Sequence, residues 1–339
     1  MRFLLKPWVL IPLLVIVIPL LGVILWLAFA PLHPNIPKAL YGGATKSLNF
    51  GHRGAAGLAP ENTMMSFEAA QKAGAHGVEF DVMFSADKKI IVFHDYKLQK
   101  RLTVEGKVSK MTLKELQKVD LTQYYTERNP GKEAPAIFKK AKVPTLEEVF
   151  AYYKKQPKAI LNIEIKNKDP FDKGFEKALA EAIKKAGFEK RVLVSSFNPF
   201  AVRRFRLAAP GIPLGLIYSP KNPIYIRNLW FLRLAKPDAL HPDHKIIDAN
   251  YMKWARGLGL KVHTWTVNDP KEMKRLIDLG VEVIITDFPD RLTQVLAGKD
   301  PKDIKVDSPK ETAPAKASEK AKSSDTPSSK APEKSPTKK

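Results

Sequence analysis

Hydrophobic positions between Ser47 and Gly298 follow two spacings in turn, and together they predict an α/β fold. Short apolar runs bounded by Gly, Pro and polar residues are typical of strands, whereas apolar positions at helical spacing are typical of amphipathic helices. Because the two kinds of segment alternate, we expect a parallel sheet covered by helices. The predicted strands are Leu48–His52, Gly77–Met83, Lys89–His94, Ile160–Ile165, Val192–Ser196, Pro213–Ile217, Ala239–His241, Lys261–Thr266 and Val281–Thr286. The clearest predicted helices are Met64–Ala73, Thr145–Lys154, Gly174–Ala186 and Pro270–Asp278.

Nine strands are one too many for an eight-stranded barrel, and the second and third explain the difference. Only residues 84–88 separate them, whereas a parallel crossover needs about a dozen residues. We therefore predict a hairpin that turns near Asp87 and places residues 79–81 opposite 93–95. Without the return strand, eight parallel strands remain. The prediction is a (β/α)8 TIM barrel over residues 47–298, with its functional groups at the carboxyl ends of the strands.

A long polar segment interrupts the barrel pattern between residues 95 and 143. It contains one short predicted helix, Thr112–Lys118, and is otherwise irregular. Insertions of this length at a strand end usually serve a function. We expect a cap that lies over the active site.

The first apolar run of the chain is the longest. Residues 8–30 carry no formal charge, and a helix of that length crosses a hydrocarbon core of about 30 Å. Ala28-Phe29-Ala30 resembles the cleavage site of a signal peptide. However, the run is longer than a normal signal core, and Pro31 would follow the cut. We therefore expect an uncleaved transmembrane helix, preceded by a head (1–7) and followed by a linker (31–46).

The charges that flank this predicted span indicate its orientation. Arg2, Lys6 and the terminal amine precede it, whereas only Lys38 is found in residues 31–45. Basic residues are retained on the cytoplasmic side of a membrane. We therefore expect a single-pass protein with its N-terminus inside and its folded domain outside the cytoplasm.

The last segment, residues 299–339, differs in composition from the rest of the chain. It is rich in Lys, Ser, Ala and Pro, has no aromatic residue, and carries 11 Lys against 7 Asp and Glu. Such a segment buries too little apolar surface to offset the entropy of the chain. We expect a disordered, solvated tail.

Composition narrows the classes of function. Lys and Arg number 57 against 35 Asp and Glu, which gives a net charge of +22, and there is no cysteine. The missing cysteines exclude disulfide scaffolds, zinc ribbons, iron–sulfur sites and thiol catalysis. The excess positive charge suits anionic substrates or a phospholipid surface. No nucleic-acid motif accompanies it, so nucleic acid is not expected as a partner.

Charged residues occur together where the predicted strands end. Glu79 and Asp81 are two residues apart on one strand, so both side chains point to the same face. Glu164 and Lys166 repeat this spacing on another strand, and the predicted hairpin brings His94 beside Glu79. His52 and Arg53 follow the first strand. Because carboxyl ends of parallel strands meet at one edge, we expect these groups at a single mouth.

The residue types at this mouth indicate a reaction. Three close carboxylates cannot all stay ionised without a cation, and oxygen ligands favour Ca²⁺ or Mg²⁺. Arg53 and Lys166 suit the oxygens of a phosphate. His52 and His94 can act as an acid–base pair, one accepting a proton and the other donating one. The pattern predicts metal-assisted cleavage of a phosphodiester.

Several separated motifs together resemble the glycerophosphodiester phosphodiesterase family, part of a superfamily of phospholipase C-like phosphodiesterases. They match in order and spacing over about residues 47–295. The matching motifs are Gly51-His52-Arg53-Gly54, Pro60-Glu61-Asn62-Thr63, Glu79-Phe80-Asp81-Val82, Val92-Phe93-His94-Asp95, Glu164-Ile165-Lys166, Trp265-Thr266-Val267-Asn268 and Thr286-Asp287-Phe288-Pro289.

This resemblance implies a role for each candidate residue. It implies one divalent cation held by Glu79, Asp81 and Glu164, catalysis by His52 and His94, phosphate contacts from Arg53 and Lys166, and a glycerol pocket lined by Trp265. The implied reaction hydrolyses glycerophosphodiesters to glycerol 3-phosphate and an alcohol. The 2-hydroxyl of the substrate would attack phosphorus to give a cyclic phosphate, which water then opens. The resemblance does not assign acid and base between the two histidines.

Two other functions remain as alternatives. The same chemistry would serve a lysophospholipase D or a phosphatidylinositol phospholipase that acts on lipid-derived diesters. A silent surface-binding module is the alternative from another class, but the complete set of carboxylates and histidines argues against it.

Some residues have structural alternatives to a functional role. Glu61 and Asn62 are expected to support the site from behind, Asn62 by bracing the first loop with hydrogen bonds. Thr286 and Asp287 are expected to brace the last loop. Residues 224–234 are aromatic, apolar and basic. We expect a barrel helix there, with a membrane-interface patch as the alternative.

Overall fold

The computed structural model describes residues 15–23, 31–32, 34, 36, 38–41, 47–98, 105–167 and 174–306. The chain divides into two units, residues 1–306 and 307–339. The second unit lies outside the described residues, and most of the predicted tail lies there. The predicted domain boundary at Gly298 falls short, because Ile304 is buried among the barrel helices.

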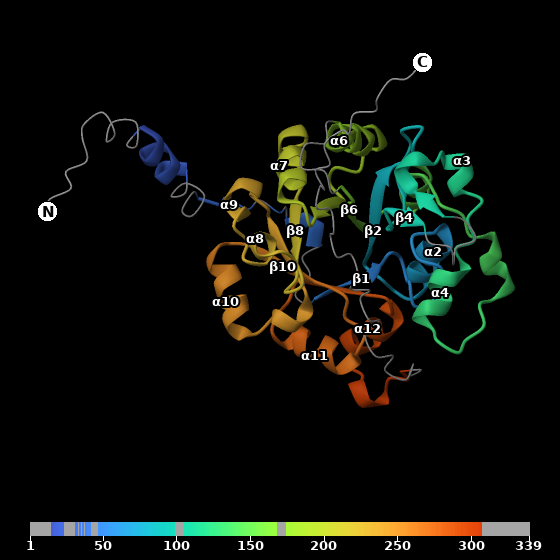
Figure 1. Cartoon of the computed structure of the whole chain (residues 1–339). Helices are drawn as coiled ribbons and strands as arrows, with labels where there is room; N and C mark the ends of the chain where they lie inside the picture. Colours follow the sequence, from blue (N-terminus) through green and yellow to red (C-terminus); the bar gives the residue numbers. More distant parts are fainter. Residues whose placement is uncertain are drawn as a thin grey trace, which may run out of the picture. The chain divides into compact units, whose positions relative to one another are not determined.

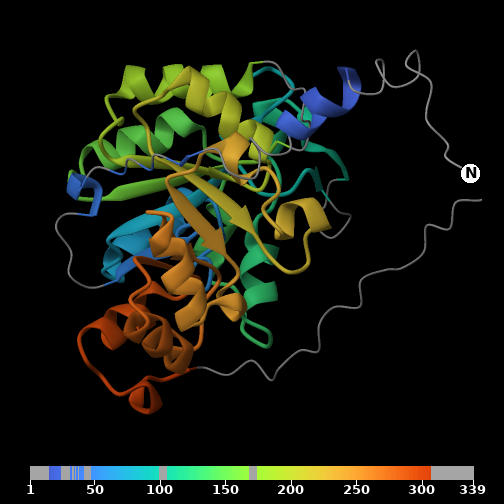
Figure 2. The same ribbon diagram turned by 90° about the vertical axis from the view of Figure 1, so that its left-hand side faces the viewer.

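Eight parallel strands close into a barrel, as the sequence predicted (Figures 1 and 2). Their order around the barrel is β1-β11-β10-β9-β8-β7-β6-β2, and pairing of β1 with β2 closes the ring. The strands are β1 (Leu48–His52), β2 (Gly77–Phe84), β6 (Ile160–Ile165), β7 (Val192–Ser196), β8 (Leu214–Tyr218), β9 (Ala239–Pro242), β10 (Lys261–Thr264) and β11 (Val283–Thr286). Three of these match the predicted bounds, and the others shift by one or two residues.

The ninth predicted strand forms a hairpin rather than a barrel strand. β3 (Ile90–Val92) pairs antiparallel with β2, with Val82 opposite Val92 and Phe84 opposite Ile90. This register is symmetric about residue 87 and places 79–81 opposite 93–95, so both parts of the prediction are confirmed. β3 is shorter than predicted because its ladder with β2 extends only from Ile90 to Val92. Beyond it, the Phe93 amide still donates to the Asp81 carbonyl at 2.9 Å.

Helices follow most of the strands and surround the barrel (Figure 2). They are α2 (Met64–Lys72), α5 (Leu146–Lys154), α6 (Phe175–Ala186), α7 (Pro199–Ala208), α8 (Ile224–Arg227), α9 (Leu232–Ala235), α10 (Ala249–Gly257), α11 (Pro270–Asp278) and α12 (Pro289–Leu296). Short 3₁₀ turns lie at Lys38–Tyr41, His244–Ile246 and Pro301–Asp303. Polar caps start several helices: Thr145, for example, forms a capping box with Glu148 at the start of α5.

Side-chain alternation along β2 separates the hydrophobic core from the site. Val78, Phe80 and Val82 face outward and are buried against the helices, where the Phe80 and Phe67 rings lie 5.5 Å apart. Burial of one such aromatic side chain stabilises the fold by about 1.5–3 kcal/mol. Glu79 and Asp81 therefore have to face the interior of the barrel. The apolar half of the pattern thus positions the polar half.

The segment 95–143 folds against the hairpin with a small core of its own. Its elements are β4 (Lys97–Leu98), β5 (Gly106–Lys107), a 3₁₀ turn (Val108–Lys110), α3 (Leu113–Leu116), α4 (Thr122–Arg128) and a second 3₁₀ turn (Ala136–Lys140). Leu116 and Tyr124 are buried there together with Ile91 and Phe93 of the hairpin. The predicted helix Thr112–Lys118 is shorter than expected, because Thr112 caps it and only Leu113–Leu116 is helical.

Residues 15–23 of the predicted membrane span are helical. The rest of that span, and the head before it, lie outside the described residues. Among the helices that the structure does describe, none has the length and apolar character needed to cross a bilayer. The transmembrane helix therefore stays a prediction.

Candidate active site

The candidate residues meet in a cavity at the carboxyl edge of the barrel. Its volume is about 120 Å³. Side chains from the loops and strands on all sides of the barrel line it: His52, Arg53, Glu79, His94, Asn162, Glu164, Lys166, Phe197, Ile217, His241, Trp265 and Ile285. Seven of the eight residues predicted to touch metal or substrate are among them, and the eighth, Asp81, is buried directly beside them.

Three buried carboxylates cluster at the cavity, two of them in its lining and Asp81 beside them. Strand register explains the cluster, because Asp81 on β2 is opposite Glu164 on β6. Glu79, Asp81 and Glu164 each offer an oxygen within 4.8 Å of the others, and all three are buried. The i, i+2 spacing on adjacent strands therefore produces the predicted cluster.

These carboxylates perturb each other. Burial raises the pKa of Glu79 well above its usual range, and the charges of Asp81 and Glu164 raise it further. Burial also raises the pKa of Glu164, against the opposing effect of Lys166. Asp81 is the exception, because Lys166 and neighbouring cations outweigh burial and hold its pKa below the usual range. A divalent cation would remove this repulsion, so the all-oxygen donor set fits Ca²⁺ or Mg²⁺.

His52 is oriented by the carboxylate of Asp287, which directly follows the neighbouring strand β11. Its Nδ1 lies 2.7 Å from Asp287 Oδ1, while its Nε2 lies 3.9 Å from Glu79 Oε2. Asp287 in turn accepts hydrogen bonds from Asn268 at 2.8 Å and from Arg128 at 3.2 Å. Burial lowers the pKa of His52, and Asp287 opposes that shift. The predicted role of Asp287 was to brace the last loop. In the structure, Asp287 also directs Nε2 of His52 toward the cavity.

His94 has the same kind of partner. Its Nδ1 lies 2.7 Å from Asp95 Oδ1, and Tyr124 of the insertion donates to Asp95 Oδ2 at 2.7 Å. The hairpin carries His94 into the cavity that Glu79 also lines. Both histidines therefore present one ring nitrogen to a carboxylate, which fixes the tautomer.

The two cations of the site are held by the carboxylates. Lys166 Nζ lies 2.6 Å from Glu164 Oε1 and 3.3 Å from Asp81 Oδ1. Arg53 contacts Glu61 Oε1 at 2.5 Å, and its Nε lies 3.4 Å from Asp81. Both cations are within reach of any anion that enters the cavity.

The backbone conformation explains the two glycines of the Gly51-His52-Arg53-Gly54 motif. Gly54 has a φ of +86°, and a Cβ there would lie 2.3 Å from the Ser66 hydroxyl. A Cβ on Gly51 would lie 2.0 Å from the Gly54 carbonyl oxygen. The resulting tight turn lets the Arg53 amide donate to Glu79 Oε2 at 3.0 Å. Glycine is therefore required at both ends of the motif.

Glu61 and Asn62 support the site, as predicted from the motif. Asn62 donates to Asp81 Oδ2 at 2.8 Å and accepts from the Asp81 amide at 3.3 Å. Glu61 is buried between Arg53 and Arg128, which hold its pKa below the usual range against the effect of burial. The contacts of Glu61 with Arg53 and with Arg128 join the first loop to the insertion.

Besides Asn162, Ile217, His241 and Ile285 of the cavity lining, sequence reasoning missed three residues that contact the predicted site residues or their partners. Arg128, at the end of α4, pairs with Glu61 and Asp287. It therefore connects the insertion to the partner of Arg53 and to the partner of His52. Phe197 forms a wall with Trp265, with the two rings 5.5 Å apart. The third is Asp95, the partner of His94. Its motif offered a signal, whereas nothing local to Arg128 or Phe197 did.

Two other histidines, His263 and His244, do not line the cavity, whereas His241 on β9 does. His263 is buried and its Nε2 lies 2.8 Å from the Tyr41 hydroxyl. His244 pairs with Glu272 at 2.7 Å. Within the described residues, the one cluster able to hold a metal is Glu79, Asp81 and Glu164.

Comparison with known proteins gives one consistent result. Residues 52–291 match the model of the glycerophosphoryl diester phosphodiesterase family. A glycerophosphodiester phosphodiesterase of Caldanaerobacter subterraneus subsp. tengcongensis is 33% identical over 252 residues, covering 74% of this chain and 98% of the relative.

Solved structures show the same fold. One is a putative glycerophosphoryl diester phosphodiesterase of Silicibacter pomeroyi, with a TM-score of 0.66, 28% identity, and coverage of 75% of this chain and 95% of that one. Another is a phosphodiesterase of Oleispira antarctica in complex with the product sn-glycerol-3-phosphate, with a TM-score of 0.62 and 25% identity, covering 76% and 99%.

Proposed function

The chain belongs to the glycerophosphoryl diester phosphodiesterase family and is a phosphoric diester hydrolase, and from this premise we propose how its own residues perform the reaction. The proposed reaction is the metal-dependent hydrolysis of glycerophosphodiesters to glycerol 3-phosphate and an alcohol. One observation carries it. The buried cluster of Glu79, Asp81 and Glu164 borders the cavity that two carboxylate-paired histidines also line.

We propose that Glu79, Asp81 and Glu164 hold one Ca²⁺ or Mg²⁺. Their burial, their raised pKa values and their purely oxygen donors support this assignment. When bound, the ion would offset the charge that develops on the phosphoryl oxygens. It would also weaken the attraction between these carboxylates and the side chains of Lys166 and Arg53.

Lys166 and Arg53 bind the phosphate of the substrate in this proposal. Both cations point into the cavity and lie within 3.4 Å of Asp81 oxygens. Arginine contacts two phosphate oxygens at once and lysine acts as a point charge. Trp265 and Phe197 form the apolar wall for the glycerol carbons. The Trp265 indole is fixed because its Nε1 donates to the His241 carbonyl at 2.9 Å.

His52 and His94 move the protons. One imidazole accepts the proton of the substrate 2-hydroxyl as its oxygen bonds to phosphorus. The other donates a proton to the leaving oxygen as the second phosphorus–oxygen bond breaks, which yields the alcohol and a cyclic phosphate. Water then opens the cyclic phosphate to glycerol 3-phosphate, with the two roles exchanged. Asp287 and Asp95 keep each ring in the tautomer that these transfers need.

The test is the release of glycerol 3-phosphate from glycerophosphocholine by the purified full chain, with added Ca²⁺ or Mg²⁺ and with chelator. We expect activity only with metal, and a loss of about 10²–10⁴-fold in His52→Ala and in His94→Ala. His244→Ala is the matched control, because His244 contacts a carboxylate at the same 2.7 Å distance but does not line the cavity. Wild-type rates in both cavity variants would refute the assignment.

Lysophospholipase D activity is the second candidate. The aromatic and basic segment 224–234, which follows a cavity-lining strand, favours a lipid-derived substrate. Comparison of lysophosphatidylcholine with glycerophosphocholine as substrates separates the two. By the same chemistry the first yields choline and an acylated glycerol phosphate, whereas the second yields choline and glycerol 3-phosphate. A higher kcat/KM for the lysophospholipid would select this candidate.

We further propose that residues 8–30 anchor the enzyme as a single-pass protein whose catalytic domain lies outside the cytoplasm. The charge-free apolar run and the flanking Arg2 and Lys6 support this proposal. The test is the distribution of the chain between membrane and soluble fractions, followed by protease treatment of intact cells. Recovery in the soluble fraction at full length would refute it.

A further inference from the structure

We propose that the connection between β8 and β9 binds the surface of an anionic phospholipid bilayer. The contact residues are Lys221, Ile224, Tyr225, Arg227 and Trp230, which we call the α8–α9 face. This inference goes beyond the predicted anchor, because it assigns membrane contact to the folded domain itself.

Charge is the first observation. Residues 190–237 contain nine Lys and Arg but no Asp or Glu. Lys221 and Arg227 are exposed, and no ion pair to either is found within the residues that the structure describes. Arg204 and Arg206 pair with Glu176 and Asp238, which lie outside this run. The other basic residues produce a positive potential that no acidic residue of the run offsets. Such surfaces are attracted to anionic lipid headgroups.

Exposed apolar side chains are the second observation. Ile226, Leu229 and Leu232 point inward and pack against the barrel core. Trp230 is 54% exposed, Ile224 49% and Tyr225 40%. The core therefore does not need these three residues. Large aromatic and aliphatic groups beside basic ones are typical of helices that lie in the membrane interface.

The outward position of Trp230 is built into the segment. Leu229 adopts a left-handed conformation with φ of 55° between α8 and α9. The next ring, Phe231, is held by Phe200 of α7 at 5.1 Å and by Tyr225 at 6.2 Å. Phe231 thus fixes the turn while Trp230 stays in solvent. Figure 1 shows α8 and α9 beside one another next to α7.

The face lies on the side of the barrel that carries the site. Ile217, which lines the cavity, is the penultimate residue of β8. The chain leaves β8 at the carboxyl edge, and α8 begins at Ile224. Contact of this face with a bilayer would therefore bring the cavity mouth toward the lipid. Access to lipid-derived diesters, a consequence that rests on the proposed function, would follow.

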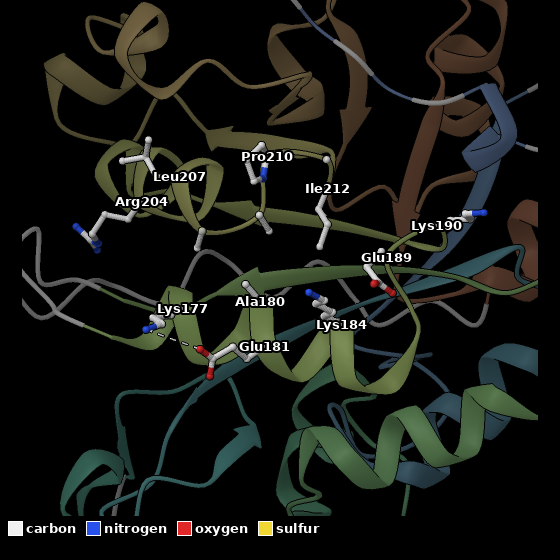
Figure 3. A pocket seen from close by; sticks show the side chains of 13 residues that line it. Lys177, Ala180, Glu181, Lys184, Glu189, Lys190, Arg204, Leu207, Pro210 and Ile212 are labelled. Carbon is white, nitrogen blue, oxygen red and sulfur yellow. Dashed lines mark ion pairs between the residues drawn. The ribbon is translucent and has the colours of Figure 1, made fainter.

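A second surface feature makes a useful contrast. A groove of about 990 Å³ is lined by residues of α6, α7 and the segments that follow them (Figure 3). Its rim holds Lys184 and Arg204, but also Glu181 and Glu189. Lys177 lies 3.9 Å from Glu181, and Arg204 pairs with Glu176. The groove is lined by four basic and two acidic side chains, so its positive charge is partly offset, whereas the α8–α9 face contains no acidic residue.

The absence of cysteine allows a site-specific test on the full chain. A polarity-sensitive fluorophore is attached to Trp230→Cys, and to Trp254→Cys as the matched control. Trp254 is an exposed tryptophan on α10, 43% accessible. Vesicles of phosphatidylglycerol with phosphatidylcholine are compared with vesicles of phosphatidylcholine alone. We expect a blue shift at position 230 with the anionic vesicles and none at position 254.

The control also separates this face from the N-terminal segment. Insertion of residues 8–30 alone would leave the two probes alike, so equal shifts, or no shift at position 230, would overturn the proposal. Arg227→Gln should weaken the response at position 230 about fivefold in lipid concentration. Turnover of soluble glycerophosphocholine by both labelled chains reports the chemistry separately, so its loss would count against the proposed function and not against the membrane contact.

Discussion

Replacing Asp287 by Asn changes the partner of His52 while preserving its shape. Three donors surround this carboxylate: His52 Nδ1 at 2.7 Å, Asn268 Nδ2 at 2.8 Å and Arg128 Nη1 at 3.2 Å. An amide has only one accepting oxygen. If that oxygen faces Arg128, the amide nitrogen faces His52 and donates to Nδ1. The proton of the ring then moves to Nε2, which removes the lone pair from the cavity side.

The size of the effect follows from this tautomer. In the well-characterised Ser-His-Asp triad, the same change of Asp to Asn costs about 10⁴ in kcat. General acid–base catalysis by one group is worth about 10²–10⁴. We therefore expect kcat to fall by about 10²–10⁴ in Asp287→Asn, with a small change in KM. Asp287 also raises the pKa of His52 against burial. Its loss should lower that pKa and move the limb of the pH–rate profile that reports His52 to lower pH.

The assay is release of glycerol 3-phosphate from glycerophosphocholine at saturating metal, across pH. Glu272→Gln is the matched control, because Glu272 lies 2.7 Å from His244 Nδ1 outside the cavity. Circular dichroism and thermal unfolding would establish that Asp287→Asn is folded. A folded Asp287→Asn enzyme with kcat within about threefold of the wild type, and an unmoved pH profile, would refute the orienting role of Asp287.

Three further predictions concern metal binding, the cap and pH. Millimolar Ca²⁺ or Mg²⁺ should raise the Tm of the wild type, because binding adds about 2.7 kcal/mol to the free energy of unfolding at a hundredfold excess over Kd. The rise should vanish in Asp81→Asn but persist in Asp87→Asn, whose carboxylate is exposed, and calorimetry with chelator checks this. Arg128→Met should lower the free energy of unfolding by about 3 kcal/mol, since Glu61 and Asp287 lose a buried partner; urea unfolding with no measurable change would contradict it. His241 is buried with both ring nitrogens unpaired, and burial lowers its pKa to about 3. Because the unfolded chain binds this proton near pH 6.5, stability should fall by about 2 kcal/mol from pH 7 to pH 5, and His241→Leu should flatten that part of the urea-unfolding pH profile.

The barrel and its acidic cluster could be predicted from residue patterns alone. Alternation along a strand has a period of two, so apolar residues at 78, 80 and 82 force 79 and 81 inward whatever the rest of the fold does. The short gap between the second and third strands excluded a parallel crossover. Both inferences are local, and pairing of neighbouring strands at one edge then placed Glu164 beside Asp81.

The way in which the catalytic rings are held depends on contacts that form only in the folded chain. Asp287 reaches His52 across 235 positions, and Arg128 reaches Asp287 across 159. No periodicity encodes such contacts, because they depend on how the insertion packs on the hairpin and where the last strand closes against the first. The exposure of Trp230 beside a partly buried Phe231 was equally invisible in the sequence, since both are aromatic residues in one apolar run. Which of them turns outward depends on the backbone turn at Leu229 and on the ring of Phe200.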